Sequence, residues 1–214
     1  MDATVTVRSV EEVGPDTYAI RFDTPAGLAA EPGQFVKLGT EIGDELVARF
    51  YTLSSPNTTD SFEVTVGIDP EVGGEFSAFL AEIAPGVEME LSGPFGTDHY
   101  DGEPRTVVLA GGPGVGPAVA IAERTLDDGG EAAIVYRDDD PAHERRLEAL
   151  RDRGASVEVL GNDDDLTDAV ADATTATDGE TFFVYGFADF VADAETAIDA
   201  AGGDLDAAKI ENFG

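Results

Sequence analysis

The sequence has no cysteine among its 214 residues. This absence excludes disulfide bonds, thiolate-ligated zinc, a cysteine nucleophile and every cysteine-ligated iron–sulfur cluster on this chain. A chain of this length buries enough surface to be stable without such crosslinks. Any redox chemistry must therefore use another kind of cofactor.

Basic residues are also scarce, since 12 Lys and Arg stand against 45 Asp and Glu, for a formal net charge of −33. This balance argues against binding to nucleic acid. The acids are dispersed among apolar residues, and the longest aspartate runs, 138–140 and 163–165, have three residues each, so we expect a folded protein. Only Lys37 and Lys209 are lysines, and the composition resembles that of cytoplasmic proteins from salt-adapted organisms, in which salt screens surface repulsion.

Long hydrophobic runs are absent too. The longest uncharged stretch, residues 106–122, is interrupted by glycines and prolines, and the N-terminus lacks the basic and apolar segments of a signal peptide. A membrane span needs about 20 predominantly apolar residues. We therefore expect a cytoplasmic protein without a membrane span.

Two hydrophobic periodicities divide the chain. From residue 4 to about residue 92, apolar and polar residues alternate, which is typical of half-buried antiparallel strands. After Gly102-Glu103-Pro104, short apolar strands alternate with amphipathic helices, which indicates parallel βαβ units. The sequence therefore predicts two domains: a six-stranded antiparallel Greek-key β-barrel in residues 1–101 and a parallel-sheet α/β domain in residues 104–214.

The predicted elements follow from these periods and from the turn residues between them. The first half has strands near residues 5–7, 18–22, 34–40, 46–53, 62–68 and 87–91, and one helix over residues 76–83. The second half has strands at 106–110, 132–136, 156–160 and 181–185, and helices at 116–126, 143–153, 166–173 and 187–201.

A glycine-rich turn joins the first parallel strand to its helix. Gly111, Gly112 and Gly114 would let the backbone approach a phosphate, and the free N–H groups and dipole of the helix that follows favour an anion. The spacing is Gly-x-Gly-x-Gly and not the dinucleotide-binding Gly-x-Gly-x-x-Gly. A tight strand-to-helix turn explains it equally well when it is taken alone.

Two further motifs of the first half could bind a phosphorylated aromatic ligand. Arg49 and Tyr51 lie two residues apart on a predicted strand and so share a face, where a guanidinium can hold a phosphate and a phenol ring offers a flat surface. Gly73 and Gly74 precede the predicted helix, where backbone amides and the Ser77 hydroxyl form a second possible anion site. The alternatives are a barrel-rim arginine with an ordinary strand tyrosine, and a plain helix cap.

Together these motifs resemble those of the ferredoxin–NADP reductase type of flavoprotein, in the right order and over essentially the whole chain. Residues 32–35 look like the Pro-Gly-Gln-Phe turn of the family, residues 49–52 like its flavin motif Arg-x-Tyr-Ser/Thr, residues 74–77 like its Gly-x-x-Ser, and residues 93–96 like its Gly-Pro-Phe-Gly. Residues 110–117 resemble its nicotinamide-nucleotide loop, and residues 211–214 its acidic–aromatic ending.

This resemblance implies FAD, with FMN the weaker alternative, and a nicotinamide nucleotide whose C4 hydride passes to flavin N5. The residues that match reacting positions are Tyr51, packed on the flavin ring, Thr52, near N5, and Glu211. The residues that match cofactor-binding positions are Arg49, Tyr51, Thr52, Leu53, Ser54, Gly74, Phe76, Ser77, Gly111, Gly112, Gly114, Val115, Arg137 and Phe213. Strand alternation would point Thr52 away from Tyr51.

The chain departs from the family where Tyr185-Gly186 replaces the Cys-Gly that often ends the last parallel strand. His99 and His143 have no ligand partner at a useful spacing, so we expect both at the surface or at a rim, and no metal site. Arg137 lies where α/β nucleotide domains meet the adenine ribose, but the aspartates at 138–140 oppose a 2′-phosphate, which favours NADH slightly over NADPH.

The sequence therefore predicts an NAD(P)H-dependent flavoprotein oxidoreductase that passes electrons to a separate acceptor, such as ferredoxin, another redox protein or a small molecule. Two alternatives remain at this stage. One is an NAD(P)H:flavin reductase that uses free flavin as a substrate. The other is a non-catalytic nucleotide-binding subunit of an electron-transfer complex.

Overall fold

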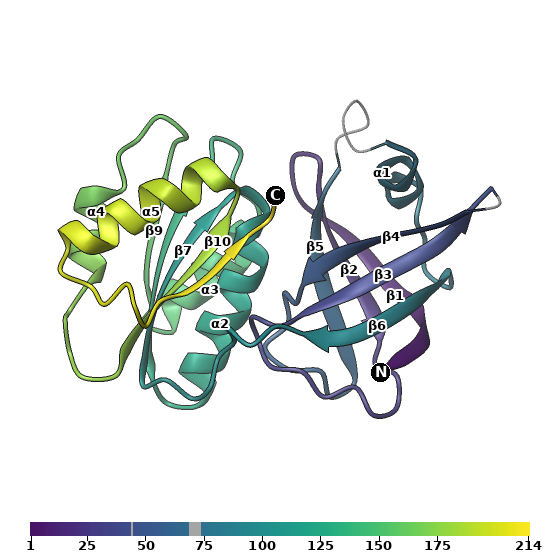
Figure 1. Cartoon of the computed structure of the whole chain (residues 1–214), viewed down its shortest axis with the longest axis horizontal. Helices are drawn as coiled ribbons and strands as arrows, with labels where there is room; N and C mark the ends of the chain where they lie inside the picture. The colour runs from purple at the N-terminus through teal and green to yellow at the C-terminus, as the bar shows by residue number, and fades with distance from the viewer. Residues whose placement is uncertain (44, 69–73) are drawn as a thin grey trace.

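The computed structural model of the chain describes residues 1–43, 45–68 and 74–214, which form two sheets lying side by side (Figure 1). The first half of the chain forms an antiparallel sheet and the second half a parallel sheet covered by helices. The predicted fold class is confirmed. None of the described helices has the length and apolar character needed to cross a bilayer.

Six strands in the order β4-β3-β6-β1-β2-β5 form the antiparallel sheet. β6 returns to lie between β3 and β1, as in a Greek key. Leu53 and Val64 form an isolated bridge between the end of β4 and β5, so the two edges of the sheet meet and the sheet curls into a barrel. The bounds are β1 Asp2–Gly14, β2 Thr17–Asp23, β3 Phe35–Ile42, β4 Glu45–Thr52, β5 Ser61–Gly67 and β6 Glu88–Phe95.

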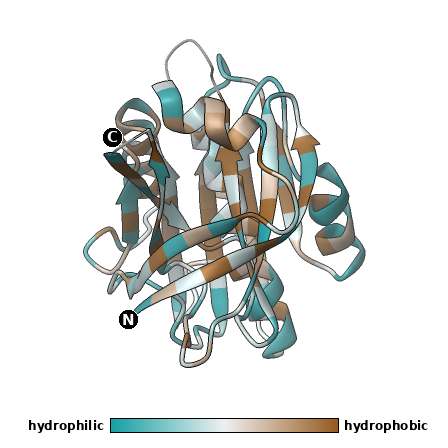
Figure 2. Ribbon diagram, turned by 90° about the vertical axis from the view of Figure 1, so that its right-hand side faces the viewer, coloured by the Kyte–Doolittle hydropathy of each residue, from teal (hydrophilic) through white to brown (hydrophobic). Residues whose placement is uncertain are grey.

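Alternating apolar side chains fill the barrel, and Figure 2 shows these brown positions along the strands. Phe22 and Phe62 stack in this core with ring centroids 5.1 Å apart. Helix α1 (Gly74–Ala81) covers one end of the barrel and buries Phe76 and Leu80. Gly73, which the sequence places before this helix, lies outside the described residues.

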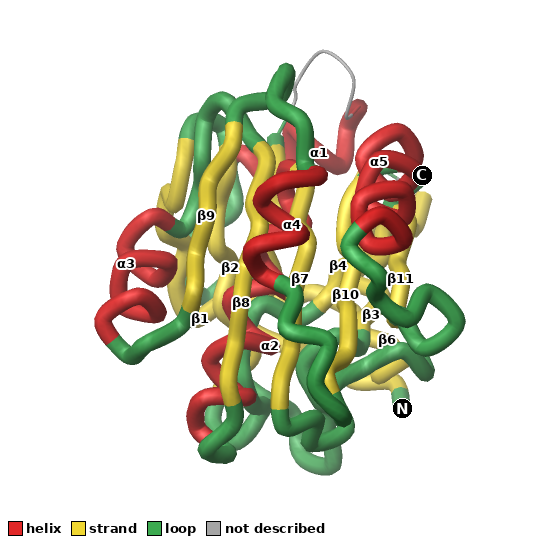
Figure 3. The backbone as a smooth tube through the Cα atoms, turned by 90° about the vertical axis from the view of Figure 1, so that its left-hand side faces the viewer, coloured by secondary structure: helices red, strands yellow, loops and turns green. Residues whose placement is uncertain are grey.

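Five strands in the order β11-β10-β7-β8-β9 form the parallel sheet. Helices α2 and α3 cover the face that looks toward the barrel, and α4 and α5 cover the other face (Figures 1 and 3). The bounds are β7 Arg105–Gly111, β8 Glu131–Arg137, β9 Ser156–Leu160, β10 Glu180–Gly186, β11 Lys209–Asn212, α2 Val115–Asp127, α3 Glu144–Asp152, α4 Thr167–Ala173 and α5 Ala188–Ala200.

The strand order reverses between β7 and β10, because the chain moves from β7 to β8 on one side and returns to β10 on the other. In sheets of this kind, ligands bind at the carboxyl ends of the strands beside this reversal. The strands predicted from hydrophobic periodicity do not include β11. It pairs in parallel with β10, with Tyr185 opposite Glu211, and brings the C-terminal residues to the same edge.

Several cations of the second domain join it to the barrel. Arg124 of α2 pairs with Glu31 at 3.0 Å and also donates to the carbonyl oxygen of Pro56. Arg146 of α3 pairs with Glu63 at 2.9 Å and donates to the carbonyl oxygen of Ser54 at 2.8 Å.

Two more cations make contacts of this kind. Lys209 of β11 donates to the carbonyl oxygen of His99 in the segment that connects the sheets, and pairs there with Glu103 at 2.5 Å. Arg145 pairs with Glu11 of β1. Four of the 12 basic residues thus lie at this junction.

Candidate functional site

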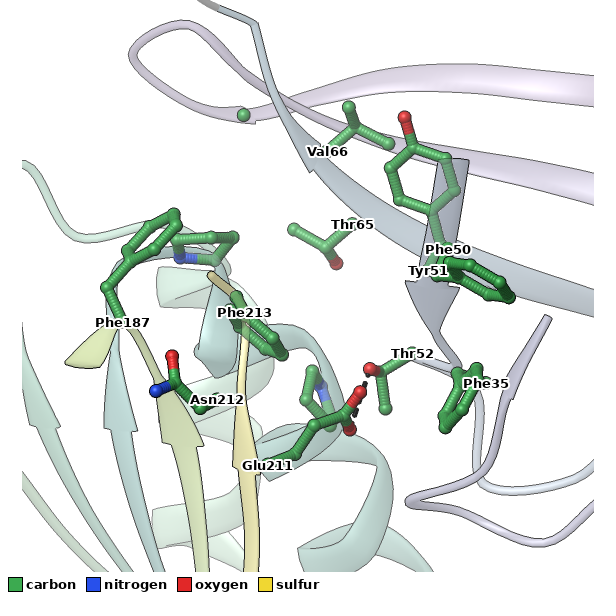
Figure 4. Close-up of a pocket in the computed structure, with 13 residues that line it drawn as sticks. Phe35, Phe50, Tyr51, Thr52, Thr65, Val66, Phe187, Glu211, Asn212 and Phe213 are labelled. Atoms are coloured by element: carbon green, nitrogen blue, oxygen red, sulfur yellow. Dashed lines mark hydrogen bonds between the residues drawn. The ribbon is translucent and has the colours of Figure 1, made fainter. Parts of the chain in front are cut away.

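A cavity of about 450 Å³ lies between the barrel and the carboxyl edge of the parallel sheet, beside the strand reversal. Aromatic and apolar side chains form most of its wall, with few polar groups (Figure 4). This composition is typical of sites for flat organic ligands. The lining residues are Phe35, Phe50, Tyr51, Thr52, Thr65, Val66, Gly67, Pro113, Pro117, Phe187, Glu211, Asn212 and Phe213.

The end of β4 supplies the barrel side of the cavity. Tyr51 and Thr52 both line it, although strand alternation sends their side chains in different directions (Figure 4). Burial raises the pKa of the Tyr51 phenol, and the nearby Arg49 opposes that rise. Tyr51 is therefore a neutral aromatic surface at neutral pH.

Arg49 lies beside the start of α1. Its guanidinium is exposed, donates to the carbonyl oxygen of Ala48 at 2.9 Å and lies 5.9 Å from the centroid of the Phe76 ring. Arg49 makes no ion pair with any carboxylate of the described residues. The structure thus brings together the two motifs that the sequence proposes for a phosphate, the arginine of β4 and the Gly74–Ser77 helix start.

The other side of the cavity comes from the ends of β10 and β11. Phe213 lies against Phe187 with ring centroids 6.1 Å apart and planes nearly perpendicular. The Phe213 amide donates to the carbonyl oxygen of Gly186 at 3.0 Å, which fixes the last residues of the chain beside the cavity. The tail therefore presents an aromatic ring opposite the end of β4 (Figure 4).

One hydrogen bond crosses the cavity floor. The Thr52 hydroxyl donates to Glu211 Oε2 at 3.0 Å. Burial raises the pKa of the Glu211 carboxyl to about 7; the bond from Thr52 lowers that pKa, and Asp98 raises it further. Near neutral pH this carboxyl can therefore both hold and release a proton.

The glycines of the loop after β7 lie in different surroundings, so each position has its own structural explanation. A Cβ on Gly112 would meet nothing within 4 Å, and Gly112 has a φ of +54°, so its backbone is open to a ligand. A Cβ on Gly114 would lie 2.8 Å from the Tyr185 carbonyl carbon, and one on Gly111 would lie 2.6 Å from the Phe190 ring. Packing against β10 thus accounts for the glycine at position 114, and its role toward a phosphate stays a prediction.

Arg137 ends β8 at a separate cavity of about 430 Å³. It pairs with Asp193 at 2.9 Å and lies 5.1 Å from the centroid of the Phe190 ring. Asp163, Asp164 and Asp165 also line this cavity. The arginine is therefore already neutralised, in strongly acidic surroundings.

Several residues that the sequence assigns to a cofactor do not line the main cavity. Leu53 is fully buried in the barrel core, and Ser54 is buried in a hydrogen bond with Thr65. Val115 lies in the core between the parallel sheet and α2. The side chains of these three residues serve packing, and a contact with a cofactor, which their backbone would have to make, stays a prediction.

Other residues at the site have no motif that sequence reasoning could use. Phe187 follows the last residue of β10, so the rule that ligands meet the ends of parallel strands could have found it. Thr65, Val66 and Gly67 belong to β5 and carry no such signal. Phe35 and Phe50 are 5.6 Å apart and form an aromatic group with Phe95 at the barrel surface.

The expected surface position of the histidines is wrong for His143, which is 4% exposed. His143 packs where α3 meets the barrel, and its Nε2 lies 2.8 Å from Thr65 Oγ1. His99 is partly buried in the connecting segment, 3.3 Å from a carboxylate oxygen of Asp101.

The residues present fit a flavin. Tyr51 and Phe213 supply flat surfaces for a ring. Thr52 and Glu211 supply a hydroxyl and a carboxyl that could contact the edge of that ring. Arg49 lies near the start of α1, where a phosphate is favoured. The open backbone at Gly112 gives a second anionic ligand access from the parallel-sheet side.

Comparisons with known proteins agree with this geometry. Residues 4–100 match the family of oxidoreductase FAD-binding domains. The chain is 31% identical, over 97% of its own length, to the ferredoxin reductase component of 3-ketosteroid-9-alpha-monooxygenase from Mycolicibacterium smegmatis. It is 33% identical, over 56% of its length, to the glycine betaine monooxygenase reductase subunit of Pseudomonas aeruginosa. The matches span 64% and 33% of these relatives, respectively.

The fold is also that of a solved ferredoxin NADP+ reductase from Neisseria gonorrhoeae with bound FAD and NADP, with a TM-score of 0.82 and 17% identity. That match covers 100% of this chain and 99% of the other. Residues 4–100 are thus similar to oxidoreductase FAD-binding domains, and the fold of the whole chain is that of a solved ferredoxin NADP+ reductase.

Proposed function

We propose that the protein is an NAD(P)H-dependent flavoprotein oxidoreductase that takes a hydride from a nicotinamide nucleotide and passes electrons to a separate acceptor. The observation that carries this proposal is the cavity between Tyr51 and Phe213, where the FAD-binding domain meets the carboxyl edge of the parallel sheet. The proposed domains are residues 1–101 for the flavin and 104–214 for the nucleotide.

The chain's own residues divide the binding work. Arg49 and the start of α1 at Gly74 and Ser77 would hold the phosphates of FAD, while Tyr51 would support its ring. The loop at Gly111 and Gly112 would hold the phosphates of the nicotinamide nucleotide by its backbone amides. When bound, the flavin would supply the ability to accept a hydride and to give up electrons one at a time.

Thr52 and Glu211 would handle protons at the edge of the ring. Because the pKa of Glu211 is raised to about 7, its carboxyl can gain or lose a proton near neutral pH without a large energetic cost, while the Thr52 hydroxyl stays protonated and orients this carboxyl by its hydrogen bond. Phe213 and Phe187 would limit the access of water to this edge.

NADH is proposed as the preferred nucleotide. Arg137, which ends the second parallel strand, where such domains meet the adenine ribose, is already paired with Asp193, and the aspartates at 163–165 line the same cavity. A further phosphate would meet these carboxylates, although strong salt reduces the repulsion.

The acceptor is proposed to be a separate redox protein. The relatives named above are described as reductase components or subunits of monooxygenases, and this chain would supply electrons to a protein of that kind. The excess of acids is proposed to reflect a salt-adapted organism.

The test uses purified protein in strong salt under anaerobic conditions. A yellow protein whose flavin absorbance is bleached by NADH, and which then reduces an added one-electron acceptor, supports the proposal. A colourless protein that reduces free FAD with NADH would instead be a flavin reductase. A colourless protein without activity after incubation with FAD would overturn the enzymatic proposal.

A further inference from the structure

His143 stands out at the domain junction because three unusual features coincide there. Its side chain is buried, and its backbone has a left-handed φ of +57°, which is uncommon for residues other than glycine, although Asn, Asp and His adopt it more often than the rest. Its amide donates to the carbonyl oxygen of Val13 at 2.8 Å, which ties the start of α3 to β1. Nonglycine residues in this conformation persist where the surroundings hold them in place, often at functional sites.

The imidazole begins a short chain of side-chain hydrogen bonds. His143 Nε2 lies 2.8 Å from Thr65 Oγ1, and that oxygen lies 2.7 Å from Ser54 Oγ. Both hydroxyl residues are buried in the barrel, Thr65 on β5 and Ser54 after β4. The chain therefore joins the start of α3 to two separate segments of the FAD-binding domain.

The first turn of α2 rests on the end of this chain. A Cβ placed on Gly116 would lie 2.6 Å from Thr65 Oγ1 and 2.8 Å from Thr65 Cβ, and it would also collide with Ser54 Oγ. The backbone of α2 thus approaches the hydroxyl pair as closely as a glycine permits. Pro113 and Pro117, on either side of this contact, line the main cavity.

Fixed hydrogen bonds explain this chain better than proton transfer does. Burial lowers the pKa of His143 to about 3, and the cation of Arg146 lowers it further, so the imidazole stays neutral at ordinary pH. Ser54 is fully buried, does not line the cavity, and its hydroxyl makes no other hydrogen bond among the described residues. This chain of hydrogen bonds thus touches the cavity wall only at Thr65 and ends at Ser54 beneath α2.

We propose that His143 is a positioning residue that acts through Thr65 and Ser54. This chain of hydrogen bonds fixes the position of the first turn of α2 against the FAD-binding domain. That position in turn determines the affinity of the Gly111–Gly112 loop for the nicotinamide nucleotide. This inference rests on the proposed function, because it assigns the nucleotide to that loop.

The experiment compares Thr65→Val, which removes one hydroxyl at nearly constant shape, with His143→Asn, which tolerates the left-handed backbone but is too short to reach Thr65. NAD⁺ is titrated into the oxidised, flavin-loaded proteins without turnover, and FAD is titrated into the flavin-free proteins. Hydrogen exchange of the amides at residues 114–120 is followed in the absence of ligand.

We expect each variant to raise the Kd for NAD⁺ about fivefold, as for one lost hydrogen bond, and to speed exchange at residues 114–120. In His143→Asn, whose side chain does not line the main cavity, the Kd for FAD should change less than twofold. The double variant should be no worse than Thr65→Val, because the residues act in one chain. Thr65→Ser, which retains the hydroxyl, should recover most of the lost NAD⁺ affinity.

Thr106→Val is the matched control, since it removes a buried hydroxyl that pairs with Thr125 at 3.0 Å inside the second domain. It should lower the melting temperature without changing the Kd for NAD⁺. An unchanged Kd for NAD⁺ in both Thr65→Val and His143→Asn, or a rise in the Kd for FAD in His143→Asn equal to its rise for NAD⁺, overturns the inference. Wild-type protein that binds neither FAD nor NAD⁺ overturns the proposed function instead, and the exchange rates of the ligand-free variants then still report whether the chain positions α2.

Discussion

Thr52 and Glu211 are 159 positions apart in the chain, yet the hydroxyl of the first donates to the carboxyl of the second at 3.0 Å. This bond is the point where the last strand of the parallel sheet meets the barrel within the cavity. It places a carboxyl of raised pKa in the wall of the cavity that Tyr51 also lines.

The first prediction concerns the pH dependence of stability. The folded pKa of Glu211, about 7, exceeds its ordinary value of 4.5, so the folded state holds a proton that the unfolded state has lost between these pH values. The stability present below pH 4.5 is therefore lost as pH rises to 7, by up to about 3 kcal/mol. Glu211→Gln, which keeps an acceptor for Thr52, should be more stable than wild type at pH 8 and similar at pH 5.

Urea unfolding at both pH values in constant strong salt measures this difference. A stability gap between Glu211→Gln and wild type that is the same at pH 5 and pH 8 would contradict the raised pKa.

The second prediction concerns flavin retention. Arg49→Ala removes the exposed guanidinium beside Phe76 and should weaken FAD binding by about one to two orders of magnitude, because a charge-assisted hydrogen bond to phosphate contributes roughly 1.5–3 kcal/mol. Fluorescence titration with FAD measures the effect. Arg151→Ala is the control, since Arg151 binds only the carbonyl oxygen of Val157 among the described residues. Equal affinities in the two variants would refute the assignment.

The third prediction separates two glycines of one loop. Gly112→Ala adds a methyl group in open space at a positive φ, and should raise the KM for the nucleotide several-fold while flavin remains bound. Gly114→Ala pushes a methyl group into the backbone of Tyr185 and should lower the melting temperature instead. Melting curves and steady-state kinetics of both variants test this. A raised KM in Gly114→Ala together with a lowered melting temperature in Gly112→Ala would show that the roles of the two glycines have been assigned the wrong way round.

The fourth prediction concerns salt. With a net charge of −33, the folded chain repels itself over about 30 Å at 0.01 M salt but over only about 3 Å at 1 M. The melting temperature should therefore rise as salt is added. Sucrose at matched osmolarity is the control for solvent exclusion, and a melting temperature independent of salt would refute the electrostatic reason.

Strong periodic patterns made most of the fold predictable. The alternation at Tyr18, Ile20 and Phe22 and the continuous apolar run of β7 each reflect burial that is written locally in the sequence. β11 was missed because its four residues are mostly half-buried and show no alternation. Its position depends on pairing with β10, which no local pattern records.

The candidate site was predictable only where residues stand in short motifs. Tyr51 and Thr52 were placed at the cavity in this way, and Glu211 and Phe213 by their resemblance to a family ending; the roles of Arg49 and of the glycine loop stay predictions. The burial of His143 was predicted wrongly because it depends on a contact with Thr65, 78 positions away. Leu53 and Ser54 directly follow the Arg49–Thr52 motif in the sequence, but their side chains are buried in the core.

The junction between the domains contains hydrogen bonds from cationic side chains to uncharged backbone carbonyl groups. Arg124, Arg146 and Lys209 each donate to a backbone carbonyl oxygen across the junction in addition to their carboxylate partners. Concentrated salt attenuates attraction between opposite charges, but a carbonyl acceptor has no net charge to be screened. Salt that screens the repulsion among surface acids therefore weakens these backbone contacts less than the ion pairs beside them, and we expect the alignment of the two domains to depend less on ionic strength than the stability of the chain does.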